Sequence, residues 1–203
     1  DQTGSTRLTY DALGDVTNST QIVAGISATT AYKYNLAGHV TQITYPTKLV
    51  VNFSYDTQGR VNGVSASNYS PTPAPAVSLA NHVTYMPFGP IASLTLGNGL
   101  VTTRGYNADY QLTSITTKSA KTTVQSLSFG YDANADITYI FDNLNPSESQ
   151  TFGYDVLNRL STASGAYSTI SYTYDADSNR LSSTQGGVTE SYRYATTSDQ
   201  LLS

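Results

Sequence analysis

The 203-residue sequence lacks cysteine and tryptophan, contains one methionine, and has few charged side chains. Without cysteine, neither a disulfide framework nor a thiolate metal site can stabilise the fold. Ten basic against fourteen acidic residues leave no basic surplus, which argues against nucleic acid as a partner. No apolar run approaches the roughly 18 residues of a membrane span, so none is expected. Packing and hydrogen bonds must therefore supply the stability.

Hydroxyl side chains, rather than charges, make the sequence polar. It contains 25 serines and 30 threonines, whereas only 12% of its residues are charged. Serine and threonine disfavour helices because they bond locally to the backbone and because threonine is branched at Cβ. Threonine and the 17 tyrosines suit a pleated, half-buried surface. The composition predicts an all-β protein with no substantial helix.

A short motif recurs along the whole chain. In its clearest copies a tyrosine is followed by Asp or Asn, by Gly a few residues later, and then by an aliphatic residue. Weaker copies depart from this pattern, for example at Tyr85, which is followed by Met86, and at Tyr154, where Asn158 replaces the glycine. These lead tyrosines recur at intervals of 20 to 30 residues, at Tyr10, Tyr34, Tyr55, Tyr85, Tyr106, Tyr131, Tyr154, Tyr174 and Tyr194. A fixed period of this kind indicates a repeat architecture. We expect residues 1–203 to form a single array of about nine repeats, as a segment or subunit of a larger assembly.

Each repeat has the chemistry of a β-hairpin. An aromatic residue two positions before the tyrosine, such as Phe53 before Tyr55, places both rings on one strand face. Asp or Asn then opens a type I turn through its side chain, and Gly closes it in the left-handed conformation. The residues expected to carry this structural signature are Tyr10, Asp11, Gly14, Tyr34, Asn35, Gly38, Tyr55, Asp56, Gly59, Tyr131, Asp132, Tyr154, Asp155, Tyr174 and Asp175.

The strand after each turn begins with aliphatic residues spaced by three, as in Val61 and Val64. A spacing of three is off-register for a flat strand, so we expect a bulge there and a curved or spiralling ribbon of tandem antiparallel hairpins. Residues 68–76 carry three prolines and cannot form a strand ladder. Residues 142–149 are expected to be another excursion between hairpins.

The sequence offers little catalytic or metal-binding chemistry. His39 and His82 are its only histidines, and His39 follows a turn glycine, which favours a surface turn residue. Residues 175–179 and 132–136 imitate the start of a calcium loop but lack the glycine and glutamate that complete it. Several acidic residues open turns. We therefore expect no enzyme, no catalytic residues, no cofactor and no metal site, although a facing carboxylate pair would permit glycan processing.

These hairpin motifs resemble the RHS/YD-repeat family, most closely at residues 53–61 and 172–181. The resemblance implies a β-hairpin ribbon that coils into a hollow shell, as in bacterial polymorphic toxins, toxin-complex subunits and animal teneurins. The family arginine after the turn is present only as Arg60, Arg159 and Arg180, so an arginine-dependent role is not expected throughout. The chain contains no Asp-Pro dipeptide, and the self-cleavage of toxin relatives is not carried over.

Together these observations predict a structural, non-enzymatic β-repeat scaffold, secreted or at the cell surface. It would serve as a shell-wall segment or as a self-associating fibre subunit. Its partners would be further copies or flanking repeats at the end strands, and a longer parent chain could enclose a cargo polypeptide. A carbohydrate-binding or adhesive module, with exposed tyrosines on a glycan, is the first alternative, and a glycan-processing enzyme is the second.

Overall fold

The structure is a computed structural model that describes residues 4–68, 75–195 and 197–202. It contains 17 strands and one short 3₁₀ helix, which confirms the all-β prediction. The chain divides into two compact units, Asp1–Thr102 and Thr103–Ser203, and each is described by itself. Within the described ranges, no helix has the length and apolar character needed to cross a membrane.

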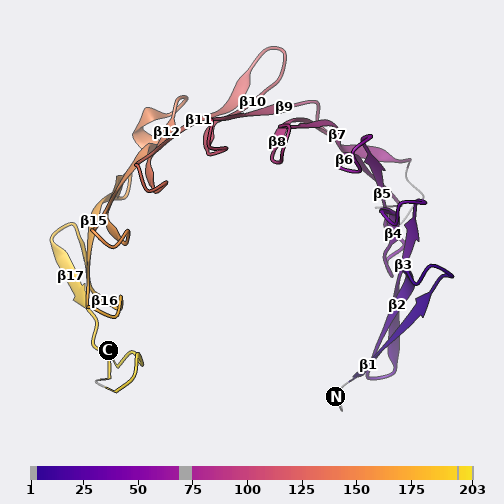
Figure 1. Ribbon diagram of the computed structural model, residues 1–203, viewed down its shortest axis with the longest axis horizontal. Helices are drawn as coiled ribbons and strands as arrows, with labels where there is room; N and C mark the ends of the chain where they lie inside the picture. The colour runs from indigo at the N-terminus through magenta and orange to yellow at the C-terminus, as the bar shows by residue number, and fades with distance from the viewer. Residues whose placement is uncertain (1–3, 69–74, 196, 203) are drawn as a thin grey trace. The chain divides into compact units, whose positions relative to one another are not determined.

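The first unit is a succession of antiparallel hairpins (Figure 1). Each strand pairs with the strand that precedes it in the sequence. The strands are β1 (Gly4–Tyr10), β2 (Val16–Val23), β3 (Ile26–Tyr34), β4 (Val40–Thr44), β5 (Val50–Tyr55), β6 (Val61–Ser67), β7 (Val77–Tyr85) and β8 (Ile91–Leu96). Strand β9 (Val101–Tyr106) lies at the division between the units.

The second unit repeats this order from β10 onward. Its elements are β10 (Leu112–Lys118), β11 (Thr123–Tyr131), β12 (Ile137–Asp142), the 3₁₀ helix η1 (Pro146–Glu148), β13 (Gln150–Tyr154), β14 (Leu160–Gly165), β15 (Ser168–Tyr174), β16 (Arg180–Gln185) and β17 (Val188–Ser191). Antiparallel pairing between neighbours in sequence keeps the contacts of each hairpin local. The predicted tandem-hairpin arrangement is confirmed within each unit.

Neither unit has a conventional hydrophobic core. Among the described residues, the buried apolar side chains are Ala66 and Ala163, each 5% exposed. Hydroxyl pairs bridge neighbouring strands, for example Thr20 to Thr29 at 2.8 Å between the Oγ1 atoms. Because each hairpin contacts chiefly its neighbours, stability is expected to be a sum of hairpin and interface contributions. The interfaces between successive hairpins therefore decide whether the array holds together.

The predicted bulge occurs where the turn rejoins the sheet. Tyr55 pairs with Val61, but the preceding Ser54 pairs with Gly63, so Asn62 is the extra residue. The same shift occurs immediately before the lead tyrosines Tyr10, Tyr34, Tyr55, Tyr85, Tyr131, Tyr154 and Tyr174. A bulge bends its strand, increases the local twist and leaves part of the ladder unpaired. The three-residue aliphatic spacing is thus the sequence signal of this bulge.

The predicted excursion over residues 142–149 is also present. The Asp142 side chain accepts hydrogen bonds from the backbone N–H groups of Leu144 and Asn145, at 2.9 and 3.0 Å, before η1 begins. The proline-rich prediction is tested only in part, because residues 69–74 lie outside the described residues. Strand β6 ends and β7 begins on either side of this stretch, in agreement with the expected interruption of the ladder.

The closing position takes the left-handed conformation in seven of the Tyr-led turns, whereas Gly89 of the Tyr85 turn has no positive φ. Glycine occupies it at Gly59, with φ of 77°, and Asn158 occupies it with φ of 59°, as the sequence predicted. Ala135 occupies the same position with φ of 70°, and its Cβ makes this conformation unfavourable. Local strain is therefore present in the turn after β11.

Replacing Ala135 with glycine is expected to raise the free energy of unfolding of the second unit by about 0.5–1 kcal/mol. Glycine removes the left-handed penalty, and its larger entropy in the unfolded chain offsets part of the gain. Urea unfolding followed by circular dichroism measures the change. Ala133→Gly is the matched control, since Ala133 lies in the same turn without a positive φ. A control variant that gains equal stability would contradict the explanation.

Candidate functional site

Where a Tyr-led turn opens with Asp or Asn, that residue fixes the turn through one side-chain oxygen. Oδ1 of Asp56 accepts hydrogen bonds from the backbone N–H groups of Gln58 and Arg60, both at 2.9 Å. The same pair of bonds occurs at Asp11, Asn35, Asn107, Asp132, Asp155 and Asp175. These bonds explain why Asp or Asn follows most of the lead tyrosines, the exceptions being Tyr85 and Tyr194. In each of these turns one side-chain oxygen therefore accepts both backbone N–H groups.

The hydroxyl of the lead tyrosine joins its hairpin to the preceding one. Tyr154 Oη donates to the backbone carbonyl of Ile137 at 2.9 Å, and Tyr174 Oη donates to that of Leu160 at 2.7 Å. Both acceptor residues lie at the bulge of the preceding hairpin, where Ile137 pairs with Tyr131 and Leu160 pairs with Tyr154. The same bond is made by Tyr34, Tyr55, Tyr85, Tyr131 and Tyr194. The tyrosine thus satisfies a carbonyl that an irregular ladder presents.

Two arginines strengthen this contact. The Arg159 guanidinium forms an ion pair with Asp155 at 2.7 Å, and its Cζ lies 4.7 Å from the centre of the Tyr174 ring. Arg60 repeats the arrangement, with Asp56 at 2.8 Å and the Tyr85 ring at 4.5 Å. A cation over an aromatic face is attracted by the ring quadrupole. We call this set of contacts the hairpin joint. It comprises the turn-opening residue, the residue four positions after it, the backbone carbonyl at the bulge, and the lead tyrosine of the next hairpin.

The third arginine does not occupy the joint. Arg180 lies one residue beyond the corresponding position, and its Cζ is 4.6 Å from the Tyr192 ring and 5.6 Å from the Tyr172 ring. In that joint the position four residues after Asp175, which arginine occupies elsewhere, is occupied by Asn179. His39 takes the arginine position in an earlier joint, where it stacks on Tyr55 with ring centres 4.9 Å apart. His39 is therefore part of an interface as well as a turn residue.

Hydrogen bonds and burial in the joint shift the pKa values of its aspartates and tyrosines. Hydrogen bonds from the backbone and side chain of Arg159 hold the pKa of Asp155 below its ordinary value, and Arg60 does the same for Asp56. Burial, followed by nearby carboxylates, raises the pKa of the lead tyrosines Tyr34 and Tyr154. The native joint thus favours ionised aspartate and protonated tyrosine.

In two joints a second carboxylate, Asp15 or Asp136, lies at the position that Arg60 and Arg159 occupy in theirs. Asp136 follows the Asp132 turn, and its Oδ2 is buried without a hydrogen-bond partner. Nearby Tyr154 has its pKa raised by burial and then by Asp136 and Asp132. A buried acceptor without a partner costs stability because it has lost its water. This joint is therefore less favourable than its arginine-containing counterparts.

Asp136→Arg is expected to raise the free energy of unfolding of the second unit by about 1–2 kcal/mol. The new side chain would pair with Asp132 and cover Tyr154, as Arg159 pairs with Asp155 and covers Tyr174. Urea unfolding of the purified variant measures the gain. Asp136→Asn is the control, because it removes the charge without supplying a guanidinium. Equal stability of the two variants would show that the arginine contacts contribute nothing.

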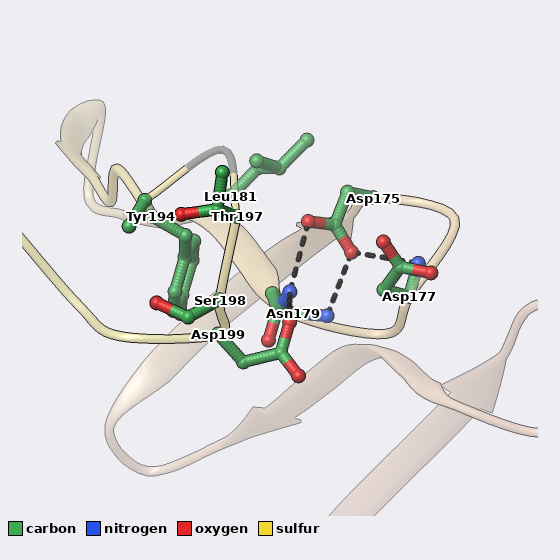
Figure 2. A pocket seen from close by; sticks show the side chains of 9 residues that line it. Asp175, Asp177, Asn179, Leu181, Tyr194, Thr197, Ser198 and Asp199 are labelled. Carbon is green, nitrogen blue, oxygen red and sulfur yellow. Dashed lines mark hydrogen bonds between the residues drawn. The ribbon is translucent and has the colours of Figure 1, made fainter.

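The turn after β15 borders the hollow shown in Figure 2. It has a volume of about 580 Å³ and is lined by Asp175, Asp177, Asn179, Tyr194 and Asp199, among others. Asn179 lies between two of these carboxylates, donating from Nδ2 to Asp175 Oδ2 at 3.1 Å and to Asp199 Oδ1 at 3.0 Å. In the portion of the chain that is described, no group of three or more His, Asp or Glu residues is arranged to hold a metal ion.

The sequence did not indicate the partners of the joint. The sequence places the rings of the lead tyrosines on one strand face, but it gives no sign that their hydroxyls bond to carbonyls 14 to 24 residues earlier in the chain. Arg60 and Arg159 were noted, but their role seemed doubtful because other repeats lack arginine. The useful signal was their position, four residues after the turn-opening aspartate, which matches the observed ion pairs. Asn179 and Asp199 carried no such signal.

Comparisons with known proteins agree with this architecture. Solved structures similar to the chain include a TcdB2-TccC3-Cdc42 complex, at 18% identity and a TM-score of 0.89, and TcdB2-TccC3 alone, at 18% and 0.88. A third is a Photorhabdus luminescens Tc holotoxin pore carrying the mutation TccC3-D651A, at 19% identity and a TM-score of 0.86. Each match covers 98% of this chain but only 12 to 13% of the other.

These structural likenesses show the fold. No curated protein matches the sequence. The family model for the teneurin YD-shell matches residues 83–201, which is more than half of the chain. The matched region includes the joints at Tyr131, Tyr154 and Tyr174. The protein is therefore a β-hairpin repeat chain that belongs to the teneurin YD-shell family.

Proposed function

We propose that the chain is a non-enzymatic stretch of shell wall in a longer, extracellular polypeptide of RHS/YD repeats. The observation that carries this proposal is the hairpin joint, which recurs with the same donor and acceptor from one repeat to the next. A joint of this kind lets a sheet extend by one hairpin at a time with nearest-neighbour contacts. The turn carboxylates and lead hydroxyls serve the backbone, which supports a structural role.

The two end strands are the expected points of continuation. All seven residues of β1 and all four of β17 are exposed. Unpaired strand edges are templates for further pairing. We propose that flanking repeats cover both edges and that the complete wall encloses a cargo polypeptide. The similar structures, of which this chain spans about an eighth, support a longer chain of this type.

Electron microscopy of the native polypeptide that contains residues 1–203 tests this proposal. Hollow particles whose wall shows a strand repeat of about 4.8 Å are expected. Filaments with a uniform repeat would instead show the fibre subunit, and solid particles without an internal space would overturn both structural roles. A glycan array probed with the same material tests the adhesive alternative, for which we expect no binding because the joint hydroxyls are already engaged.

A further inference from the structure

The hollow beside Asn179 lies at a position that arginine fills in other joints. Between the turns opened by Asp155 and Asp175, the Arg159 guanidinium occupies the space, and its Nη1 donates to the Asp175 carbonyl at 2.8 Å. Between the next two turns the corresponding residue is Asn179, whose side chain is much shorter. The shorter side chain leaves open part of the hollow shown in Figure 2, whose whole volume is about 580 Å³.

The lining of this hollow reproduces the surroundings of Arg159. Asp175 corresponds to Asp155, the ion-pair partner of Arg159, and Tyr194 corresponds to Tyr174, on whose ring Arg159 lies. Two further carboxylates, Asp177 and Asp199, line the same space. The Asn179 amide nitrogen bridges Asp175 and Asp199, so it supplies part of what a guanidinium would supply. No positively charged side chain is among the lining residues.

We propose that this hollow binds a guanidinium group, either of a small molecule or of an arginine in a peptide. A planar guanidinium offers several N–H donors to carboxylates and an apolar face to a tyrosine ring, which an ammonium ion does not. The two arginine joints of the same chain show that both contacts can form together. The inference is independent of the shell-wall proposal, because it concerns a single joint.

A calcium ion fits this hollow less well. Asp175 Oδ1 already accepts the backbone N–H groups of Asp177 and Asn179, at 3.0 and 2.8 Å, and its Oδ2 accepts the Asn179 amide. Calcium prefers six to eight oxygen ligands around one point. The described side chains do not provide such a cluster. The calcium-loop resemblance of residues 175–179 is therefore explained by the turn that Asp175 opens.

Nuclear magnetic resonance titration of the intact chain with ethylguanidinium tests the proposal. Saturable shifts of the Asp177 and Ser198 backbone amides are expected, with ethylammonium binding about tenfold more weakly or less. A Gly-Arg-Gly peptide compared with Gly-Lys-Gly shows whether the hollow also accepts a peptide side chain. Absence of saturable shifts, an equal response to ethylammonium, or the same shifts with calcium chloride would overturn the proposal.

Two variants link the binding to the hollow. Asn179→Arg is expected to fill the site from within, so that ethylguanidinium no longer shifts these amides. Asp199→Asn leaves the Asp175 turn in place and is expected to weaken binding about tenfold, because a charged acceptor is lost. Unchanged binding in Asp199→Asn, or in a folded Asn179→Arg, would place the ligand elsewhere and refute the assignment. The shell-wall proposal does not depend on the result obtained with either variant.

Discussion

Replacing Tyr131, Tyr154 and Tyr174 together with phenylalanine is expected to lower the free energy of unfolding of the second unit by about 3 kcal/mol. Each hydroxyl donates to a carbonyl of the preceding hairpin, and a typical hydrogen bond contributes about 1 kcal/mol. The three joints are separate, so their losses should nearly add. Since only one oxygen atom is removed from each ring, the loss reports the hydrogen bond and not the packing. Urea unfolding followed by circular dichroism measures it.

Tyr10 provides the matched control for this experiment. It is a lead tyrosine, but its side chain is 57% exposed, and its hydroxyl makes no hydrogen bond within the described ranges. Tyr10→Phe is expected to leave the free energy of unfolding unchanged within about 0.5 kcal/mol. If the triple variant were as stable as the Tyr10 variant, the tyrosine-to-carbonyl bond would not be what holds neighbouring hairpins together.

Alkaline solution is expected to destabilise both units. The pKa values of Tyr34, Tyr154 and Tyr174 are raised in the folded chain, chiefly by burial. Such tyrosines ionise first in the unfolded state, so their contribution to stability is complete below the unfolded pKa of about 10. It is lost as the pH rises through the higher, folded pKa values. The melting temperature should therefore fall steeply above about pH 10.

Thermal melting between neutral pH and about pH 11.5 measures this dependence. The variant without Tyr131, Tyr154 and Tyr174 should show a shallower fall in the second unit, because two of the perturbed phenols are absent. An equally steep fall in that variant would assign the alkaline sensitivity to other groups. The Tyr10→Phe variant should follow the unmodified chain.

Local features of each hairpin could be predicted from the sequence because their causes lie within a few residues. The Asp56-to-Gly59 turn needs only a side-chain acceptor and a left-handed residue. The bulge beside Tyr55 was indicated by the spacing of Val61 and Val64, and the structure places it there. Asn158 was expected in the left-handed conformation and has it, with φ of 59°.

Contacts between hairpins could not be predicted in the same way. The acceptor of the Tyr154 hydroxyl is a backbone carbonyl, so its identity depends on the register of β12 and not on a recognisable side chain. Arg159 can cover Tyr174 only because both turns emerge at the same edge of the sheet. The hollow beside Asn179 is lined by residues of two successive turns, so it could not be predicted from either turn alone.

In the seven joints described above, the acceptor of the tyrosine hydroxyl is a main-chain oxygen, and this has a consequence for the evolution of such chains. The preceding hairpin needs no particular side chain for this bond, because it supplies only a backbone carbonyl. The following hairpin supplies the tyrosine. Duplication or deletion of a single unit therefore preserves the connection without compensating substitutions on either side. Hairpin arrays of different length can arise from one repeat unit by changing the number of copies in the gene.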